Sequence, residues 1–262
     1  MLIEWIEIQF LLGVDKINFH VIEIHPNMMK VLKFYEKTTK KVKVELLTLP
    51  QGVQHTTDNQ MQKDQNEMIA LTDCFYKNMN EFFFLLSLDI NEIVVPSKPE
   101  DKTFDDLLSR VIEQARKSPV QPELYSCYAV RGSYFLLSND HKDEIQPQVP
   151  HNFLFLQHVY RGKYIAEPYN GPKSFQKTDE VEVMHKNLPF KCLNQEPCNI
   201  YEFKAKDAKA HYYKSHCPYY EEHHCDDINS NTTKDDTLWK YKTEIVANVR
   251  KIVKKLKSFK ID

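Results

Sequence analysis

An acidic cluster follows an almost unbroken apolar run in the segment FFFLLSLDINEIVVP, residues 82–96. Asp89, Asn91 and Glu92 carry oxygen atoms close enough in sequence to share one hard cation such as Mg²⁺ or Mn²⁺. A bound diphosphate can complete the shell of such a cation, which then neutralises charge on a departing nucleotide diphosphate. On spacing alone, an acidic turn after a buried strand remains the simpler interpretation.

The elements that must position this cluster alternate between helices and strands. This alternation predicts parallel βαβ units and hence an α/β domain. Ligands of such sheets bind beyond the carboxyl ends of the strands, where Asp89 is expected. The nearly all-apolar residues 82–88 predict a central strand covered on both faces. Before it we expect a helix through Ile3, Ile6 and Phe10 that ends at Gly13, a strand over 17–21, a helix from Pro26 to about Lys37, a strand over 42–49, and a helix through Met68, Phe75 and Met79.

The rest of the chain is less regular. Residues 51–66 are polar and predict either a loop or the beginning of a helix. Thr103-Phe104-Asp105-Asp106 resembles a capping box and predicts a helix to about residue 115. Aromatic, strand-like runs fill 124–164, a Cys- and His-rich irregular segment fills 191–236, and a final helix is expected over 238–257. We expect one domain over 1–262, with a donor and metal half (about 1–100) and an acceptor half (about 101–262).

Composition excludes several classes of function. The formal net charge of -2 gives no reason to expect nucleic acid as a partner. With only 5 Gly, the chain lacks the glycine-rich loops that cradle phosphates. No apolar run reaches the roughly 18 residues needed to span a bilayer. Because Met1 leads directly into helical sequence, we expect that N-terminal sequence is missing.

Six cysteines lie at 74, 127, 192, 198, 217 and 225. A disulfide between Cys217 and Cys225 is the favoured interpretation, and Cys192 and Cys198 could pair in the same way. The alternative is a zinc site that also uses the nearby His216, His223 and His224, although close C-x-x-C pairs are absent. Cys74 and Cys127 are expected to be buried apolar residues. The tripeptide Asn231-Thr232-Thr233 is a possible glycosylation sequon.

The segments EWIEIQFLLGVDKINFH, ALTDCFYKNM, LDINEIVVP, GPKSFQKTDEVEVMH and AKAHYYKSHC occur in this order between about residues 4 and 250. Together they resemble glycosyltransferase family 92, and the chain looks like an insect- or invertebrate-like member. The resemblance implies a GT-A fold, a nucleotide-sugar donor such as UDP-galactose, inversion at the anomeric carbon, and a divalent metal, expected to be Mn²⁺. It also implies a type II Golgi membrane protein with a luminal domain. From the resemblance we expect that the family's first βα unit and N-terminal anchor are missing from this sequence.

The resemblance also implies roles for single residues. Asp89 and Asn91 fall on the two aspartates of the family's D-x-D motif. His211 falls on the histidine of its H-Y-R segment and is the preferred further metal ligand, with His185 as second choice. Asp73 and Lys173 fall on segments that flank the donor.

Two positions depart from the family pattern. Asn91 replaces an aspartate, which removes one negative charge from the metal site. Tyr213 replaces an arginine that could contact phosphate.

The catalytic base is left open by the sequence. Inverting transfer requires a carboxylate on the acceptor side to accept the hydroxyl proton. The candidates are Asp140, Glu144, Asp179 and Glu180.

The predicted function is therefore metal-dependent, inverting transfer of a hexose, with galactose expected, from a UDP-sugar to a glycan. The main alternative is a catalytically silent relative that binds a glycan or a partner enzyme in the lumen. A cytosolic zinc-binding module built on the His/Cys loop is a third interpretation.

Overall fold

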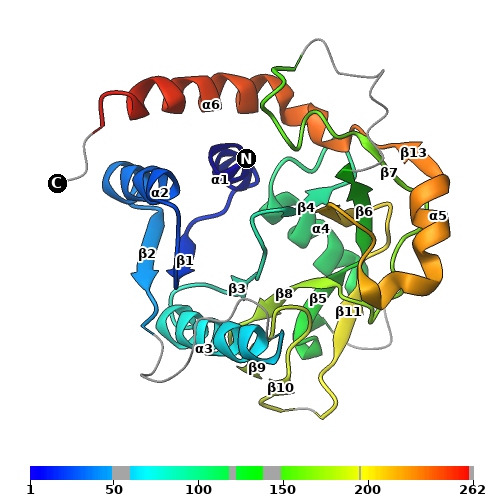
Figure 1. The fold of residues 1–262 in the computed structure, drawn as a ribbon. Helices are drawn as coiled ribbons and strands as arrows, with labels where there is room; N and C mark the ends of the chain where they lie inside the picture. Colours follow the sequence, from blue (N-terminus) through cyan, green and yellow to red (C-terminus); the bar gives the residue numbers. More distant parts are fainter. Residues whose placement is uncertain (49–59, 118–121, 138–148, 195, 260–262) are drawn as a thin grey trace.

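The computed structural model describes residues 1–48, 60–117, 122–137, 149–194 and 196–259. These form a mixed α/β structure, as predicted, with short sheets packed among helices (Figure 1). The helices are α1 (Leu2–Leu11), α2 (Pro26–Thr39), α3 (Gln60–Asn78), α4 (Phe104–Ala115), α5 (Cys225–Ser230) and α6 (Lys242–Leu256), with 3₁₀ turns η1 (Pro122–Leu124), η3 (Tyr219–His224) and η4 (Thr237–Tyr241). The strands are β1 (Ile17–Val21), β2 (Val42–Leu46), β3 (Phe84–Leu85), β4 (Glu92–Pro96), β5 (Cys127–Val130), β6 (Gly132–Leu136), β7 (Tyr160–Gly162), β8 (Lys173–Lys177), β9 (Val181–Val183), β10 (Lys191–Cys192), β11 (Ile200–Glu202), β12 (Ala208–Lys214) and β13 (Thr232–Lys234).

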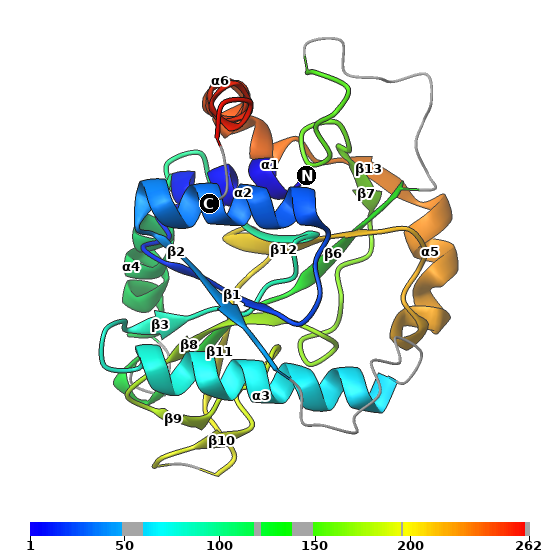
Figure 2. The ribbon, with the colours of Figure 1, turned by 60° about the vertical axis from the view of Figure 1, so that its left-hand side comes forward.

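β1 and β2 form the predicted parallel pair, with α2 as the crossover between them. The His25 side chain caps the first turn of α2, where Pro26 supplies a backbone angle already suited to a helix. The helix ends at Thr39, and Lys40, the residue that follows it, has a left-handed φ of 58°. Figures 1 and 2 show α1 and α2 on one side of these strands and α3 on the other. The N-terminal part of the chain therefore folds as the apolar periodicity predicts.

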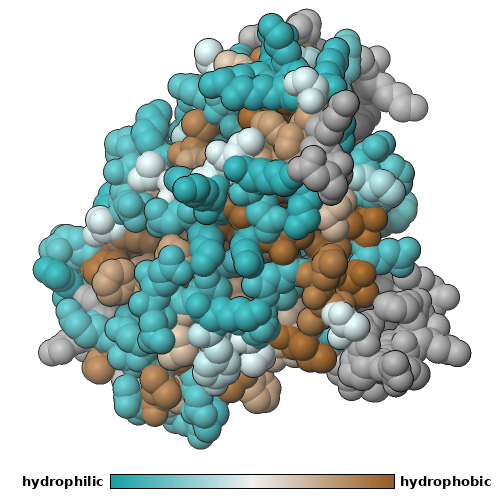
Figure 3. Space-filling model, turned by 90° about the vertical axis from the view of Figure 1, so that its left-hand side faces the viewer, coloured by the Kyte–Doolittle hydropathy of each residue, from teal (hydrophilic) through white to brown (hydrophobic). Residues whose placement is uncertain are grey.

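The side of the molecule that carries β2 and α2 is mostly hydrophilic, with apolar patches between the polar side chains (Figure 3). Leu46, at the end of β2, is 72% exposed and belongs to the large apolar residues left outside the core.

The predicted strand over 82–88 differs from what the structure shows. Only Phe84–Leu85 forms a ladder, which is antiparallel to β8, and Phe83 is 83% exposed. The expectation of a central strand covered on both faces is wrong for this segment, since among the described residues it pairs along one edge only. The next strand, β4, is instead buried at every residue.

Two sheets build the centre of the molecule. The first has the order β11-β5-β8-β3, and the second places β12 between β4, which is antiparallel to it, and β6, which is parallel. A Cβ on Gly132 of β6 would come within 2.4 Å of the Tyr212 ring, so glycine is required there for β12 to pack. The acidic cluster thus lies where β3 and β4 meet, one strand from each sheet.

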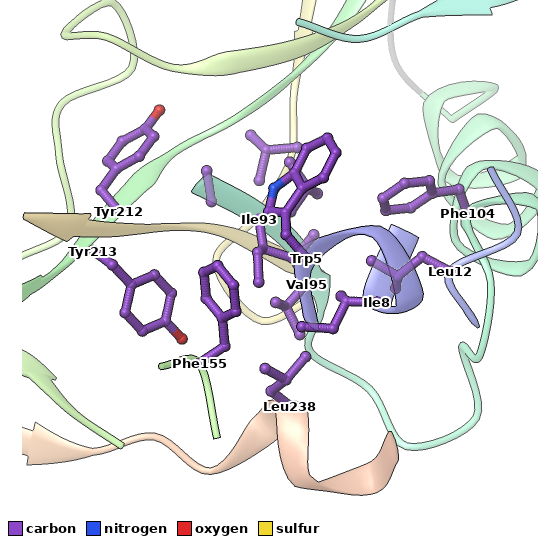
Figure 4. Packing of buried hydrophobic residues seen from close by; sticks show 14 of the residues in the cluster. Trp5, Ile8, Leu12, Ile93, Val95, Phe104, Phe155, Tyr212, Tyr213 and Leu238 are labelled. Atoms are coloured by element: carbon purple, nitrogen blue, oxygen red, sulfur yellow. The ribbon is translucent and has the colours of Figure 1, made fainter. Parts of the chain in front are cut away.

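The hydrophobic core joins the two ends of the chain to this centre. Trp5 and Ile8 of α1 pack near Ile93 and Val95 of β4, and Leu238 of η4 closes the same region (Figure 4). The Trp5 indole N–H also donates to the main-chain oxygen of Glu92 at 2.8 Å. α1 therefore holds the start of β4, and with it the acidic cluster, in place.

Glu4 ties α1 to a segment far along the chain. Its carboxylate accepts hydrogen bonds from the backbone N–H groups of Leu154, Phe155 and Leu156 at 2.7, 3.0 and 3.2 Å. Burial raises the pKa of Glu4 to about 7, against the lowering effect of these donors. These three hydrogen bonds give partners both to the buried carboxylate of Glu4 and to the three backbone N–H groups.

The remaining local predictions agree with the structure. Thr103 and Asp106 form the predicted capping box of α4. The described end of the polar segment 51–66 belongs to α3, and the predicted final helix is η4 followed by α6.

The predictions for the cysteines are confirmed except that Cys74 is only partly buried. Disulfides join Cys192 to Cys198 and Cys217 to Cys225, while Cys74 is half-buried and Cys127 buried as free thiols. The Cys217–Cys225 disulfide removes the two thiolates that a zinc site in this loop would have required.

Candidate functional site

A cavity of about 1480 Å³ opens beside the acidic cluster. Asp89 and Asn91 line it, as does Lys214 at the end of β12. Its other walls come from β1, the segment 81–88, and residues of α1, α3 and α4. The two predicted oxygen ligands and Lys214 therefore face the same space, which Lys16 also lines.

Asp89 stands at the rim of this cavity. Asp89 as a whole is solvent-exposed, but neighbouring protein atoms partly desolvate its carboxyl group. This desolvation, followed by the charge of Glu92, raises the pKa of Asp89. A cation or a phosphate-bound metal would reverse that effect, because it would favour the ionised carboxylate.

Asn91 is held by the neighbouring strand. Its amide nitrogen donates to the main-chain oxygen of Tyr213 at 3.0 Å, and its own main-chain oxygen accepts from Tyr213 N–H at 3.0 Å. Because the nitrogen faces β12, the amide oxygen faces away from it. An aspartate here could not donate the first of these hydrogen bonds.

Glu92 is buried and already neutralised by two lysines. Lys173 Nζ lies 2.7 Å from its carboxylate, Lys214 Nζ lies 3.5 Å away, and the Asp89 backbone N–H donates to it at 2.9 Å. Burial alone would raise the pKa of Glu92, but Lys173 and these other partners lower it overall. Glu92 is thus the anchor of the cluster and is not a free ligand.

The two lysines differ in their access to the cavity. The Lys173 side chain is 5% exposed and is not part of the cavity wall, whereas Lys214 is 25% exposed and lines it. Both ammonium groups lie close to the Tyr212 ring, at 5.9 and 5.8 Å from its centroid. The residue placed to meet a bound anion is therefore Lys214, which the sequence analysis missed. Its position directly after the AKAHYY segment was the available signal.

His211 lies apart from the acidic cluster. Tyr212 and Tyr213 lie on opposite sides of β12 (Figure 4), and alternation along the strand puts His211 on the side of Tyr213. There its ring packs 4.6 Å from that of Phe135, while Tyr212 lies near Glu92. The structure does not bring His211 together with Asp89 and Asn91.

His185, the second choice, is half-buried between β9 and β10 and is not part of the cavity wall. Its main-chain oxygen accepts from Gln176, and its Nδ1 accepts from Asn187 N–H at 3.4 Å.

Asp73 lies in a different cluster, with His20 and Glu45. Within the described ranges this is the one group of three His, Cys or acidic side chains close enough to hold a metal. Lys77 already donates to both carboxylates, at 2.8 Å to Asp73 and 2.6 Å to Glu45. Hydrogen bonds from Lys77 and His20 lower the pKa of Asp73 to about 2. We interpret the cluster as an ion-pair network that joins β1, β2 and α3.

The candidate bases fall into two groups. Asp140 and Glu144 lie outside the described residues. Asp179 and Glu180 follow β8, 3.6 and 3.9 Å from Lys177 Nζ, at the opposite end of that strand from Lys173. The structure therefore separates Asp179 and Glu180 from the acidic cluster.

The predicted metal ligands fit a cation in part. Asp89 and Asn91 both line the cavity, the Asn91 amide oxygen is not engaged by the hydrogen bond to Tyr213, and His211 is not part of the cavity wall. One carboxylate and one amide are enough for Mg²⁺ or Mn²⁺ when substrate phosphates and water supply the other ligands. Asp89 and Asn91 are thus the residues that would hold a metal here.

Comparison with known protein families shows the family to which the chain belongs. The family model described as glycosyltransferase family 92 matches residues 1–249 of the 262. The class of protein is therefore a glycosyltransferase, and the chain belongs to glycosyltransferase family 92. No curated protein matches the sequence. In the described part of the chain, no helix is both long and apolar enough to cross a membrane.

Proposed function

We propose that the protein transfers a hexose, with galactose as the first candidate, from a UDP-sugar to a glycan, with inversion and with Mn²⁺ as the metal. The observation that carries the proposal is the shared wall formed by Asp89, Asn91 and Lys214 in a chain of glycosyltransferase family 92. The parallel β1–α2–β2 unit and the acidic residue Asp89, which lies between β3 and β4, support a GT-A fold.

Each residue has a distinct part in this proposal. Asp89 and Asn91 would hold the metal, which when bound neutralises negative charge on the leaving diphosphate. Lys214 adds a fixed positive charge on the same wall, while Glu92 keeps Lys214 positioned. Asp140 and Glu144 stay as candidates for the base that accepts the proton of the acceptor hydroxyl.

We further propose a luminal Golgi location, with membrane attachment through an N-terminal anchor. The two disulfides support an oxidising compartment. An exposed Asn231 in the sequon is compatible with glycosylation there.

Asp89→Ala tests the donor site. We expect calorimetry with UDP to show binding to the unaltered protein that requires Mn²⁺, and a loss of at least about tenfold in affinity for Asp89→Ala, or about 1.4 kcal/mol. Asp179→Ala is the matched control, because that exposed acid lies at the far end of β8 and should bind UDP normally. The proposal fails if UDP binds no better with Mn²⁺ than without it.

The silent alternative is favoured by one observation, the use of the Asn91 amide to bind Tyr213. We expect Asn91→Asp to tighten Mn²⁺-dependent UDP binding, because it restores a carboxylate at the cavity. It should also lower the free energy of unfolding by about 1–3 kcal/mol, since a carboxylate then faces the Tyr213 oxygen. Hydrolysis of UDP-galactose by the unaltered protein and by Asn91→Asp distinguishes the two proposals. No turnover in either form would support the catalytically silent relative.

A further inference from the structure

Two exposed tyrosines lie on neighbouring segments beside the candidate donor site. Tyr169 belongs to the segment between β7 and β8, and Tyr220 belongs to η3, which follows β12. Neither residue is part of the cavity wall. Asn170 ties the two segments together, because its side-chain amide donates to the main-chain oxygen of Tyr220 at 3.4 Å. The two tyrosines therefore belong to one local surface.

A closed turn presents Tyr169 to solvent. The Asn170 backbone N–H donates to the main-chain oxygen of Glu167 at 3.0 Å. Pro168 and Tyr169 thus occupy the central positions of a β-turn, of which proline favours the first. Tyr169 is 76% exposed, and its side chain makes no hydrogen bond and no aromatic contact within the described part of the chain. The backbone of Tyr169 is therefore fixed, while its ring has no structural partner.

The end of this turn is anchored to the strand that carries Lys214. Gly171 has a φ of 62°, a left-handed value that favours glycine. The Tyr212 hydroxyl donates to the main-chain oxygen of Gly171 at 2.5 Å. The Tyr220 ring packs on the same glycine, with its Cε2 atom 3.7 Å from where a Cβ would lie. Because Lys173 and Lys214 lie 5.9 and 5.8 Å from the centroid of the Tyr212 ring, one tyrosine side chain connects the turn to the acidic cluster.

A cross-linked loop presents Tyr220. The Cys217–Cys225 disulfide closes this loop. Within the loop, the buried Glu221 accepts hydrogen bonds from the hydroxyl groups of Tyr134 at 2.9 Å and Tyr164 at 3.1 Å. Tyr220, the neighbour of this anchored glutamate, is thus held in place while it stays exposed.

The position of this surface indicates its occupant. The loop leaves the cavity wall at Ser215, directly after Lys214, and reaches Tyr220 five residues later. Burial raises the pKa of Tyr220, and the charge of Glu92 adds to the rise, so the ring lies within electrostatic reach of the acidic cluster. In a glycosyltransferase whose donor occupies the cavity, the acceptor must approach from the solvent side of the same site.

The chemistry of the two rings fits a sugar. A pyranose presents C–H groups on at least one face, and these pack on an apolar ring while the hydroxyl groups at the edge stay free to form hydrogen bonds. Tyrosine combines such an apolar face with a polar tip. Single exposed apolar side chains are ordinary on protein surfaces. Two exposed rings on anchored segments beside a transferase site are a more specific arrangement.

We propose that Tyr169 and Tyr220 form an acceptor platform, on which a pyranose ring of a glycan stacks while its reacting hydroxyl group lies toward the donor beside Lys214. The inference rests on the proposed function for the direction of transfer, and it requires no contact between the platform and UDP. Tyr169 is the better residue for a test, because its ring supports no other part of the described structure.

The first test measures glycan binding without UDP. The probe is a mixture of neutral N-linked oligosaccharides, labelled at the reducing end and passed over the immobilised protein by frontal affinity chromatography. We expect the unaltered protein to retain oligosaccharides, Tyr169→Ala to retain them at least about fivefold less, and Tyr169→Phe, which keeps the ring, to retain them normally. The platform is overturned if the unaltered protein retains none of them, or if Tyr169→Ala retains them fully.

Phe190→Ala is the matched control. Phe190 is 79% exposed, lies directly before β10 and is not part of the cavity wall. Its loss should leave retention unchanged, and an equal loss of retention in Phe190→Ala and Tyr169→Ala would overturn the proposal in favour of non-specific adsorption. The urea midpoint of Tyr169→Ala should equal that of the unaltered protein, which excludes misfolding as the cause of weaker retention.

The second test separates the platform from the donor site. In transfer from UDP-galactose to the same oligosaccharides, Tyr169→Ala should raise the KM for the oligosaccharide at least about fivefold and leave the KM for UDP-galactose unchanged. A rise in the KM for UDP-galactose alone would assign Tyr169 to the donor site and overturn the platform. Retention of oligosaccharides without Mn²⁺-dependent UDP binding would support the platform in a catalytically silent protein, so the two proposals fail separately.

Discussion

Replacing Lys173 with methionine should lower the free energy of unfolding by about 3–5 kcal/mol, because it leaves the Glu92 charge buried without its closest partner. The two groups are 2.7 Å apart, and their side chains are 5% and 6% exposed. Lys214, at 3.5 Å, compensates only in part. Urea unfolding followed by circular dichroism measures the change.

Lys177→Met is the matched control, since Lys177 lies in the same strand but pairs with acids at its outer end. That change should cost about 0–1 kcal/mol. In the double variant Glu92→Gln/Lys173→Met, part of the lost stability should return, because no charge remains buried. If Lys173→Met instead kept full stability and lost UDP binding, Lys173 would contact the donor and would not serve mainly to neutralise Glu92.

The second large effect is a loss of folding stability at acidic pH that we attribute to His211. Burial lowers the pKa of His211 to about 3, and the nearby Lys209 and Arg161 act in the same direction against Asp235. Its ordinary value is 6.5, so between about pH 6.5 and pH 3 the unfolded chain binds a proton that the folded chain does not. Stability is therefore lost as the pH falls through this window, by about 2 kcal/mol between pH 6.5 and pH 5.

His211→Phe should remove this contribution. Both ring nitrogens of His211 lack a hydrogen-bond partner among the described residues, and the ring packs on Phe135, so an apolar ring is expected to fit. At pH 7 the variant should be as stable as the unaltered protein or more so. Unfolding curves at pH 7, 6 and 5 test this, with the exposed His151→Gln as control. If the stability of His211→Phe depended on pH as that of the unaltered protein does, His211 would not be the source of the acid sensitivity.

Local signals in the sequence were sufficient for much of the fold. The capping box at Thr103, the βαβ unit of β1 and β2, and the disulfides each depend on residues near one another in the chain. Such signals act through short-range hydrogen bonds, apolar periodicity or short loops. They required no knowledge of the tertiary structure.

The candidate site was predicted less completely. Asp89 and Asn91 could be found because they lie in one short segment, but the burial and neutralisation of Glu92 depend on lysines from β8 and β12. His211 could not be placed, because a single-residue shift in strand register moves a side chain to the opposite face. The apolar run 82–88 was misinterpreted because its composition does not show that one of its edges lacks a partner among the described residues.

The hydrogen bonds of Glu4 have a consequence for synthesis of the protein on the ribosome. The acceptor is made before its donors, which lie about 150 residues later in the chain. At about 5–20 residues per second, translation needs roughly 10 to 30 s to reach them. During that interval α1 exposes the apolar face that later contacts β4 and α6. The nascent chain should therefore depend on chaperones until most of it has emerged.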